Sequence, residues 1–209
     1  MRERAKREES ATVASPLPLT LFTTTVDTHQ AALYGFLRGM LGDDEAARDL
    51  TQDTFSDAWR ATQAREAPWS ADHDADERRR WLFSIAYRRA ISHLRRRSII
   101  RWASLDASAD PATRDVVYSS VESQTPFETR IVEAEALRAA LRRLHPDDAA
   151  CLLLRVAQGF SGAETATVLG ISEEAAAQRL SRARRRLRAI YLQQNPSDEP
   201  ASKRSDDHE

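Results

Sequence analysis

The chain has 209 residues, with 31 Lys and Arg against 32 Asp and Glu, and a formal net charge of -1. Its length allows one or two domains, and its few glycines, low aromatic content and alanine-rich helical patterns favour an all-α fold made of two small helical domains. A net charge near zero would argue against nucleic-acid binding if the charges were evenly mixed, but they are segregated along the chain into acidic and basic blocks.

The single cysteine, Cys151, excludes an intramolecular disulfide and lies in an apolar run, so we expect a small core residue in a reducing cytoplasm. No secretory signal pattern opens the chain, and no apolar run approaches the roughly 18 residues that span a bilayer. The five histidines lack metal-ligand spacing, and no G-x-S-x-G motif or phosphate-binding glycine loop occurs. We therefore expect a cytoplasmic protein without a membrane span, catalytic residues, metal or cofactor.

Residues 1–26 mix charged residues with Ser, Thr and Pro without any period, so we expect a disordered tail. From His29 the pattern changes to that of a helix that ends at Gly42. Its apolar face consists of Leu33, Tyr34, Phe36, Leu37, Met40 and Leu41. Gly35 and Gly39 form a G-x-x-x-G pair in this helix, which is far too short to cross a membrane, so we interpret the pair as a place of close helix packing.

Asp43 can cap a second helix, whose buried side includes Leu50, Phe55 and Trp59. The opposite face carries six carboxylates against the single Arg48. These carboxylates are Asp43, Asp44, Glu45, Asp49, Asp53 and Asp57. The pattern is typical of a solvated face, and it also suits a surface that binds a basic protein partner. A metal site is not expected, because no histidine partners the carboxylates at helical spacing.

Residues 64–77 indicate a loop, and a third helix follows from about Arg78 to Arg101. This segment contains nine arginines and no carboxylate, interleaved with aromatic residues that include Trp81 and Tyr87. Arginines and exposed aromatic rings together suit single-stranded DNA, since guanidinium groups hold the backbone and ring faces accept unstacked bases. The alternative is that both aromatic residues belong to the core behind a charged rim.

Residues 103–125 are rich in Asp, Ser, Thr and Pro and predict a flexible linker between the domains. Thr125, Pro126 and Glu128 then combine a helix cap, a proline at the first helical position and a capping-box glutamate. The helix that follows is expected to bury Leu137, Leu141 and Leu144. A further helix from Pro146 to Gly159 is expected to bury Cys151, Leu152, Leu154 and Val156. Residues 193–209 indicate a second disordered tail.

The segment from Phe160 to Arg188 predicts a helix-turn-helix. Ser161 and Glu164 form a capping box, Gly170 ends the first helix, and Ser172 caps the second. The apolar stripe of the second helix consists of Leu180, Ala183, Leu187 and Ile190. Its basic residues are Arg179, Arg182, Arg184, Arg185, Arg186 and Arg188. Although two helices joined by a glycine turn are common, basic residues on the second helix are typical of DNA recognition.

Four motifs carry a family resemblance. They are Asp49-Leu50-Thr51-Gln52-Asp53-Thr54-Phe55, Trp81-Leu82-Phe83-Ser84-Ile85-Ala86, His93-Leu94-Arg95-Arg96-Arg97, and Leu169-Gly170-Ile171-Ser172 with Arg179-Leu180-Ser181-Arg182-Ala183-Arg184. Together and in this order they resemble the extracytoplasmic-function (ECF) sigma factors of bacterial RNA polymerase, a branch of the sigma-70 family, over roughly residues 29–191. The resemblance implies a sigma domain 2 at residues 27–102 and a sigma domain 4 at residues 126–192.

The implied partners are core RNA polymerase and promoter DNA, with an anti-sigma factor as a further partner. In the first domain, Asp49, Gln52 and Asp53 share one helix face and would bind the polymerase clamp helices. For the minus-ten element, Arg88, Arg95 and Arg96 would hold phosphates while Trp81 shapes the place for unstacked bases. For the minus-thirty-five element, Gln178, Arg179 and Arg182 would read bases while Arg184, Arg185 and Arg188 attract phosphates.

The chain also departs from the family pattern. Arg88 stands where an asparagine is common, Ser92 replaces the usual aspartate before His93, and Ala175-Ala176-Ala177 replaces a frequent Thr-Val-Lys. These departures leave the promoter preference open. The competing interpretation is a conventional helix-turn-helix regulator, whose first domain would be a sensor or a dimerisation module.

Overall fold

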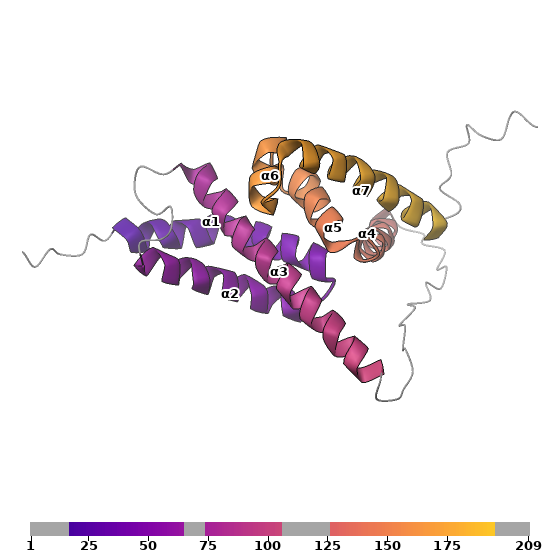
Figure 1. Ribbon diagram of the computed structural model, residues 1–209, viewed down its shortest axis with the longest axis horizontal. Helices are drawn as coiled ribbons and strands as arrows, with labels where there is room; N and C mark the ends of the chain where they lie inside the picture. Colours follow the sequence, from indigo (N-terminus) through magenta and orange to yellow (C-terminus); the bar gives the residue numbers. More distant parts are fainter. Residues whose placement is uncertain (1–16, 65–73, 106–125, 195–209) are drawn as a thin grey trace, which may run out of the picture.

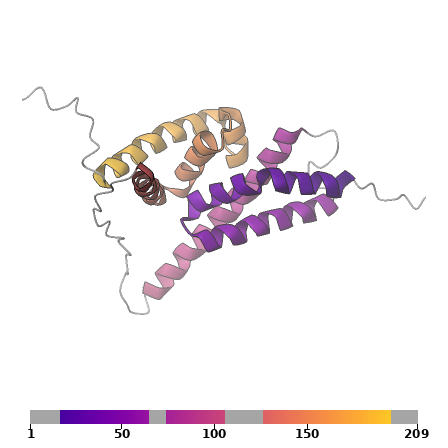
Figure 2. The same ribbon diagram turned by 180° about the vertical axis from the view of Figure 1, so that it is seen from behind.

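The computed structural model describes residues 17–64, 74–105 and 126–194, and every regular element in these ranges is a helix. The all-α prediction is confirmed. Two groups of helices pack against each other, and we call them the N-terminal domain (α1 to α3) and the C-terminal domain (α4 to α7) (Figures 1 and 2). The N-terminal domain consists of α1 (Leu17–Leu41), α2 (Asp44–Gln63) and α3 (Ala75–Leu105). The C-terminal domain consists of α4 (Pro126–Arg142), α5 (Pro146–Leu152), the π-helix η1 (Leu153–Ala157), α6 (Gly162–Leu169) and α7 (Glu173–Gln194).

Helix α1 begins well before the position that its apolar pattern predicts. The hydroxyl groups of Thr23 and Thr25 donate to helix carbonyls one turn earlier, at 3.0 and 2.8 Å, so these polar residues remain helical. Phe22 packs against Trp59 of α2 with ring centroids 4.9 Å apart. The predicted N-terminal tail is therefore wrong for residues 17–26, because threonines can sit in a helix when their hydroxyls bond to its carbonyls and a neighbouring ring covers the apolar face. Residues 1–16 lie outside the described residues.

The two glycines of the G-x-x-x-G pair in α1 have different surroundings. A Cβ atom at Gly39 would lie 2.8 Å from a methyl carbon of Leu153 in the C-terminal domain, whereas a Cβ atom at Gly35 would meet nothing within 4 Å. Close packing is thus confirmed for Gly39 and wrong for Gly35. The small residue at Gly39 lets α1 approach η1 of the other domain.

Helix α3 extends beyond its predicted bounds at both ends. It begins at Ala75 with Asp76 and Glu77 in its first turn, where carboxylates stabilise the positive end of the helix dipole. It continues through residues 103–105, which we predicted as linker, and its C-terminal end projects beyond the other helices in both views (Figures 1 and 2). Residues 106–125 of the predicted linker lie outside the described residues.

Two apolar side chains of the C-terminal domain are exposed, although we predicted them as buried. Leu137 of α4 is 43 % exposed, because Ala136 and Ala140 occupy the buried side of that helix. Val156 is 66 % exposed, because the helix after Leu152 widens into a π-helix and the wider turn rotates this side chain outwards.

Buried side chains form one core that is continuous across both domains. Phe36 of α1, Phe83 of α3 and Phe160 of the C-terminal domain are fully buried, with ring centroids 5.5 and 5.0 Å apart along this series. Cys151 is also fully buried, and its thiol lies 3.6 Å from the Ala176 carbonyl oxygen. The prediction that this cysteine is a core residue is confirmed.

Candidate nucleic-acid interface

The helix-turn-helix is present as predicted, with each of its boundary residues in the expected role. Glu164 donates its backbone amide to the Ser161 hydroxyl at 3.2 Å, and the Ser161 amide donates to the Glu164 carboxylate at 2.8 Å. Gly170 ends α6 in the left-handed conformation with φ 67°, and the Ser172 hydroxyl accepts the Ala175 amide at 3.1 Å. These bonds fix the angle at which α7, the helix after the turn, leaves α6.

The six predicted DNA-binding residues of α7 do not lie on a single face. With roughly 3.6 residues per turn, Gln178, Arg182 and Arg185 point in one direction, and all three are exposed. Arg184 and Arg188 point toward α4, where they border a shallow hollow together with Leu137. Because one DNA groove meets only one side of a helix, the six residues cannot all contact it in the same way.

Arg179, the sixth residue, is engaged inside the protein. Its guanidinium lies 2.7 Å from Asp147 of α5, and the same carboxylate accepts a hydrogen bond from the Tyr87 hydroxyl of α3 at 2.8 Å. Burial alone would raise the pKa of Asp147, but the hydrogen bonds from Arg179 and Tyr87 outweigh it and lower that pKa. Burial, followed by the hydrogen bond to Asp147, raises the pKa of Tyr87, so its hydroxyl stays a neutral donor.

Sequence reasoning missed Asp147 and its neighbour Asp148, which pairs with Arg186 of α7 at 2.9 Å. The two carboxylates lie in the first turn of α5, and both also form ion pairs with arginines of α7. The available signal is the pair of consecutive acids at the start of α5, in a domain whose last helix is basic. The sequence indicates Tyr87 only as a core residue or a base-stacking ring, because its contact between the two domains carries no local signal.

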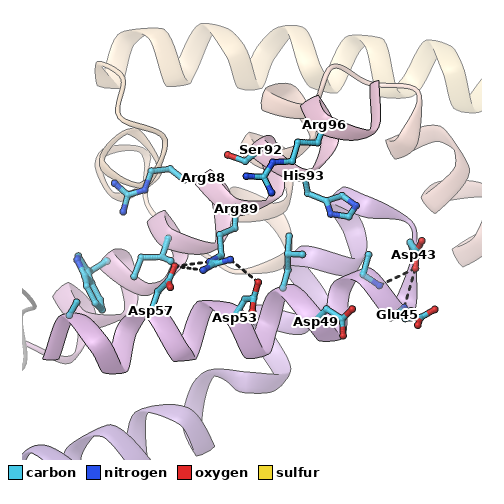
Figure 3. Close-up of a pocket in the computed structure, with 15 residues that line it drawn as sticks. Asp43, Glu45, Asp49, Asp53, Asp57, Arg88, Arg89, Ser92, His93 and Arg96 are labelled. Carbon is cyan, nitrogen blue, oxygen red and sulfur yellow. Dashed lines mark hydrogen bonds and ion pairs between the residues drawn. The ribbon is translucent and has the colours of Figure 1, made fainter. Parts of the chain in front are cut away.

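The acidic face of α2 lies opposite α3 across a hollow of about 820 Å³ (Figure 3). Asp49 and Asp53 border it from α2, and Trp81, Arg88 and Arg96 border it from α3. Arg89 crosses between the helices and binds Asp53 at 2.7 Å and Asp57 at 2.8 Å. The structure thus brings most of the predicted polymerase-binding and minus-ten residues around one hollow of mixed charge.

Gln52 lies on a different side of α2 from that hollow. It borders an apolar groove of about 750 Å³ between α1 and α2, which is lined by Phe22, Tyr34, Phe55 and Trp59 among others. The three predicted polymerase-binding residues therefore border two hollows, with Asp49 and Asp53 on one side and Gln52 on the other.

The predicted minus-ten arginines are exposed, and they differ in their surroundings. Arg95 and Arg96 lie in the C-terminal half of α3, and neither has an ion pair within the part of the chain that the structure describes. Arg88 lies one turn from Ser84 and within 3.5 Å of its hydroxyl. Trp81 is half-buried and packs against the core. Arg95 and Arg96 are therefore, among the described side chains of α3, exposed cations that are available to phosphates.

In residues 17–64, 74–105 and 126–194, no group of three or more His, Cys, Asp and Glu could hold a metal ion. The helices in these ranges also include none that is both long and apolar enough to cross a bilayer.

Comparisons with known proteins agree with the two-domain arrangement. Residues 25–99 match the family Sigma-70 region 2, and residues 134–187 match the family Sigma-70, region 4. The chain is 30 % identical over 181 residues to the ECF RNA polymerase sigma factor SigL of Mycobacterium tuberculosis, covering 84 % of this chain and 91 % of that protein. It is 32 % identical over 155 residues to the ECF RNA polymerase sigma factor SigX of Bacillus subtilis, covering 73 % of this chain and 74 % of that protein.

A solved structure has the same fold. It is the sigma factor RpoE of Bartonella quintana in complex with the anti-sigma factor NepR, with a TM-score of 0.58, 25 % identity, and coverage of 81 % of this chain and 95 % of that one.

Proposed function

The chain belongs to the extracytoplasmic-function sigma factors of bacterial RNA polymerase, and we propose that its two domains divide promoter recognition between the C-terminal half of α3 and the exposed face of α7. A sigma factor directs the polymerase to promoters and is not itself an enzyme. The observation that supports the division is the presence of two separate exposed cationic surfaces, at Arg95 and Arg96 and at Arg182 and Arg185, in one chain.

A run-off transcription assay with purified core polymerase tests this function. We expect a transcript from the chain's own promoter only when the chain is added to core, and only weak binding of the free chain to promoter duplex. Tight binding of the free chain to duplex DNA, without any transcript from core, would instead indicate a conventional regulator. Comparison with the known families does not favour that alternative.

Asp49, Gln52 and Asp53 would bind the polymerase clamp helices, with the apolar groove beside Gln52 supplying contact area. Asp53 already pairs with Arg89, so a charge reversal there would also break an internal contact. Asp49 is exposed and has no ion pair among the described residues, which makes Asp49→Lys the cleaner variant. We expect it to weaken core binding about tenfold. Glu133→Lys, at an exposed site on α4, changes the net charge equally and should leave core affinity unchanged.

Strand opening would depend on the α3 side of the hollow between α2 and α3. Arg95 and Arg96 would hold the phosphates of the separated strand, while Trp81 and Arg88 border the space that could accept an unstacked base. The carboxylates on the opposite wall repel phosphates, so the backbone should follow α3 rather than α2.

The minus-thirty-five element would be read by Gln178, Arg179 and Arg182, with Arg184, Arg185 and Arg188 contributing phosphate attraction. Since Arg184 and Arg188 point toward α4, they should contact the backbone at the edge of the groove rather than bases.

An anti-sigma factor would be a further partner, because the structure of RpoE from Bartonella quintana is a complex with one. We place the action of the chain in the cytoplasm, where polymerase and promoters are found.

A further inference from the structure

The face of α3 that borders the hollow between α2 and α3 continues past the end of that hollow. Residues three, four or seven apart lie on one face of a helix. Trp81, Arg88, Ser92 and Arg96 border the hollow at these spacings, and Ile99 continues the row one turn further. Figure 3 shows Arg88, Ser92 and Arg96 following one another along α3. The side chain of Ile99 therefore lies on the hollow-facing side of α3.

The hollow itself ends just before Ile99. Its acidic wall begins at Asp43, the cap of α2, and Arg97 pairs with that residue at 3.7 Å. Ile99 follows two residues later, between this ion pair and the C-terminal end of α3, which projects beyond the other helices (Figures 1 and 2). It does not line the hollow, and it is 62 % exposed. Ile99 therefore lies at the open end of the hollow.

Neither burial nor helix propensity explains an isoleucine at this position. Single exposed apolar side chains are common, and Leu19 of α1 is 60 % exposed as well. Ile99 differs from Leu19 in its neighbours, because the exposed cations Arg95 and Arg96 lie one turn before it. On a surface that binds DNA, an apolar side chain can insert between neighbouring base pairs and unstack them. Its place in this row thus suits a contact with bases.

We propose that Ile99 is an apolar wedge at the fork where the promoter duplex meets the opened strand. The inference rests on the proposed function, in which the opened strand follows α3 and an unstacked base enters the hollow beside Arg88. A rise of 1.5 Å per residue places Ile99 about 16 Å from Arg88 along the helix. A strand that leaves the hollow along Arg95 and Arg96 reaches Ile99 within a few nucleotides, where its side chain stacks against the last base pair and opposes its closing.

Two substitutions at Ile99, each matched at Leu19, test the proposal in holoenzyme assembled from the full-length chain and core polymerase. Ile99→Ala removes the apolar side chain, and Ile99→Arg replaces it with a further cation in the same row. Leu19→Ala and Leu19→Arg make comparable changes at a similarly exposed site on α1. Two measurements are made with each holoenzyme. The first is permanganate-detected opening of the promoter duplex, and the second is affinity for the same promoter with a mismatched minus-ten region that is already open.

We expect Ile99→Ala to lower opening of the duplex about threefold, because the last base pair can close again without the wedge. Its affinity for the already open promoter should equal that of the wild type. Ile99→Arg should open the duplex as poorly as Ile99→Ala, although its added charge attracts DNA. Both Leu19 variants should match the wild type. The proposal is overturned if Ile99→Ala opens the duplex normally, if Ile99→Arg opens it as well as the wild type, or if Ile99→Ala binds the open promoter threefold more weakly.

Arg95→Ala in the same two measurements separates this proposal from the proposed function. Loss of a phosphate contact should weaken binding to the open promoter as well as opening of the duplex. If Arg95→Ala has both effects while Ile99→Ala opens the duplex normally, only the wedge is wrong. If Arg95→Ala and Ile99→Ala both match the wild type in both measurements, the opened strand does not follow α3, and the proposed function of this surface is wrong as well.

Discussion

Helices α3 and α7 have similarly basic sequences, but their arginines have different surroundings. In α3, several arginines form hydrogen bonds or ion pairs with acceptor groups of the protein itself. These are Arg79 on Gln158, Arg80 on Glu164, Arg89 on Asp53 and Asp57, and Arg97 on Asp43. Among the residues that the structure describes, the ion pairs of α7 lie on the side that faces α5, at Arg179 and Arg186. Arginines of α3 therefore make structural contacts both with the C-terminal domain, through Arg79 and Arg80, and with α2, through Arg89 and Arg97, whereas α7 carries exposed cations along most of its length.

This comparison shows that the number of arginines on a helix does not measure its capacity to bind DNA. What matters is which guanidinium groups lack a partner inside the protein.

Phe83→Ala should lower the free energy of unfolding by about 3–5 kcal/mol, because it empties a fully buried site between Phe36 and Phe160. Urea unfolding measures the loss. Ile99→Ala on the same helix is the control, since Ile99 is 62 % exposed and its loss should change stability by less than about 0.5 kcal/mol. Equal stabilities of the two variants would show that α3 does not connect the domains.

Arg179→Ala should reduce the preference of the holoenzyme for its minus-thirty-five element by about 1–3 kcal/mol if Arg179 makes a bidentate contact with a guanine. Competition binding with promoter variants measures the preference. The loss should be confined to one or two base positions. A uniform loss over all sequences would place Arg179 among the phosphate-binding residues instead.

Arg95→Ala should reduce permanganate-detected strand opening by roughly fivefold, because an exposed arginine in the C-terminal half of α3 would no longer hold a phosphate. Arg89→Ala is the matched change at a paired arginine, and it should cost about 1 kcal/mol of folding stability while opening stays normal. If Arg89→Ala impairs strand opening as much as Arg95→Ala does, in holoenzymes of equal stability, then paired and unpaired arginines of α3 do not differ in their contribution to opening.

Arg188→Ala should have the smallest effect, a weakening that is equal for all sequences. The slope of log affinity against log salt should fall in magnitude by about 1, because one phosphate contact is lost. A salt series with matched and scrambled duplexes measures it. An unchanged slope would mean that the side of α7 facing α4 does not reach the DNA backbone.

The features that the sequence predicts correctly depend on neighbouring residues. The capping box of Ser161 and Glu164, the turn at Gly170 and the cap at Asp43 are each formed within a few residues. The helix-turn-helix and the helical fold could therefore be predicted from local patterns. The start of α1 could not, because its helical state depends on the contact between Phe22 and Trp59 of another helix.

The partners of the candidate site residues depend on distant parts of the chain. Tyr87 and Asp147 are far apart in the sequence, and no local pattern indicates that they share a hydrogen bond with Arg179 as the third member. The same is true of Asp53, whose pairing with Arg89 depends on how α3 lies across α2. A pattern can predict which face of a helix is charged, but the tertiary packing decides which charges remain available.

The single cysteine gives the protein an internal reporter of its own local unfolding. Cys151 is fully buried between α5 and α7, and burial raises the pKa of its thiol, so the closed C-terminal domain offers no reactive thiolate. A thiol reagent can therefore modify only molecules in which these helices have transiently separated. The modification rate, followed under native conditions, reports the opening equilibrium of the DNA-binding domain in the unaltered chain, free or bound to polymerase.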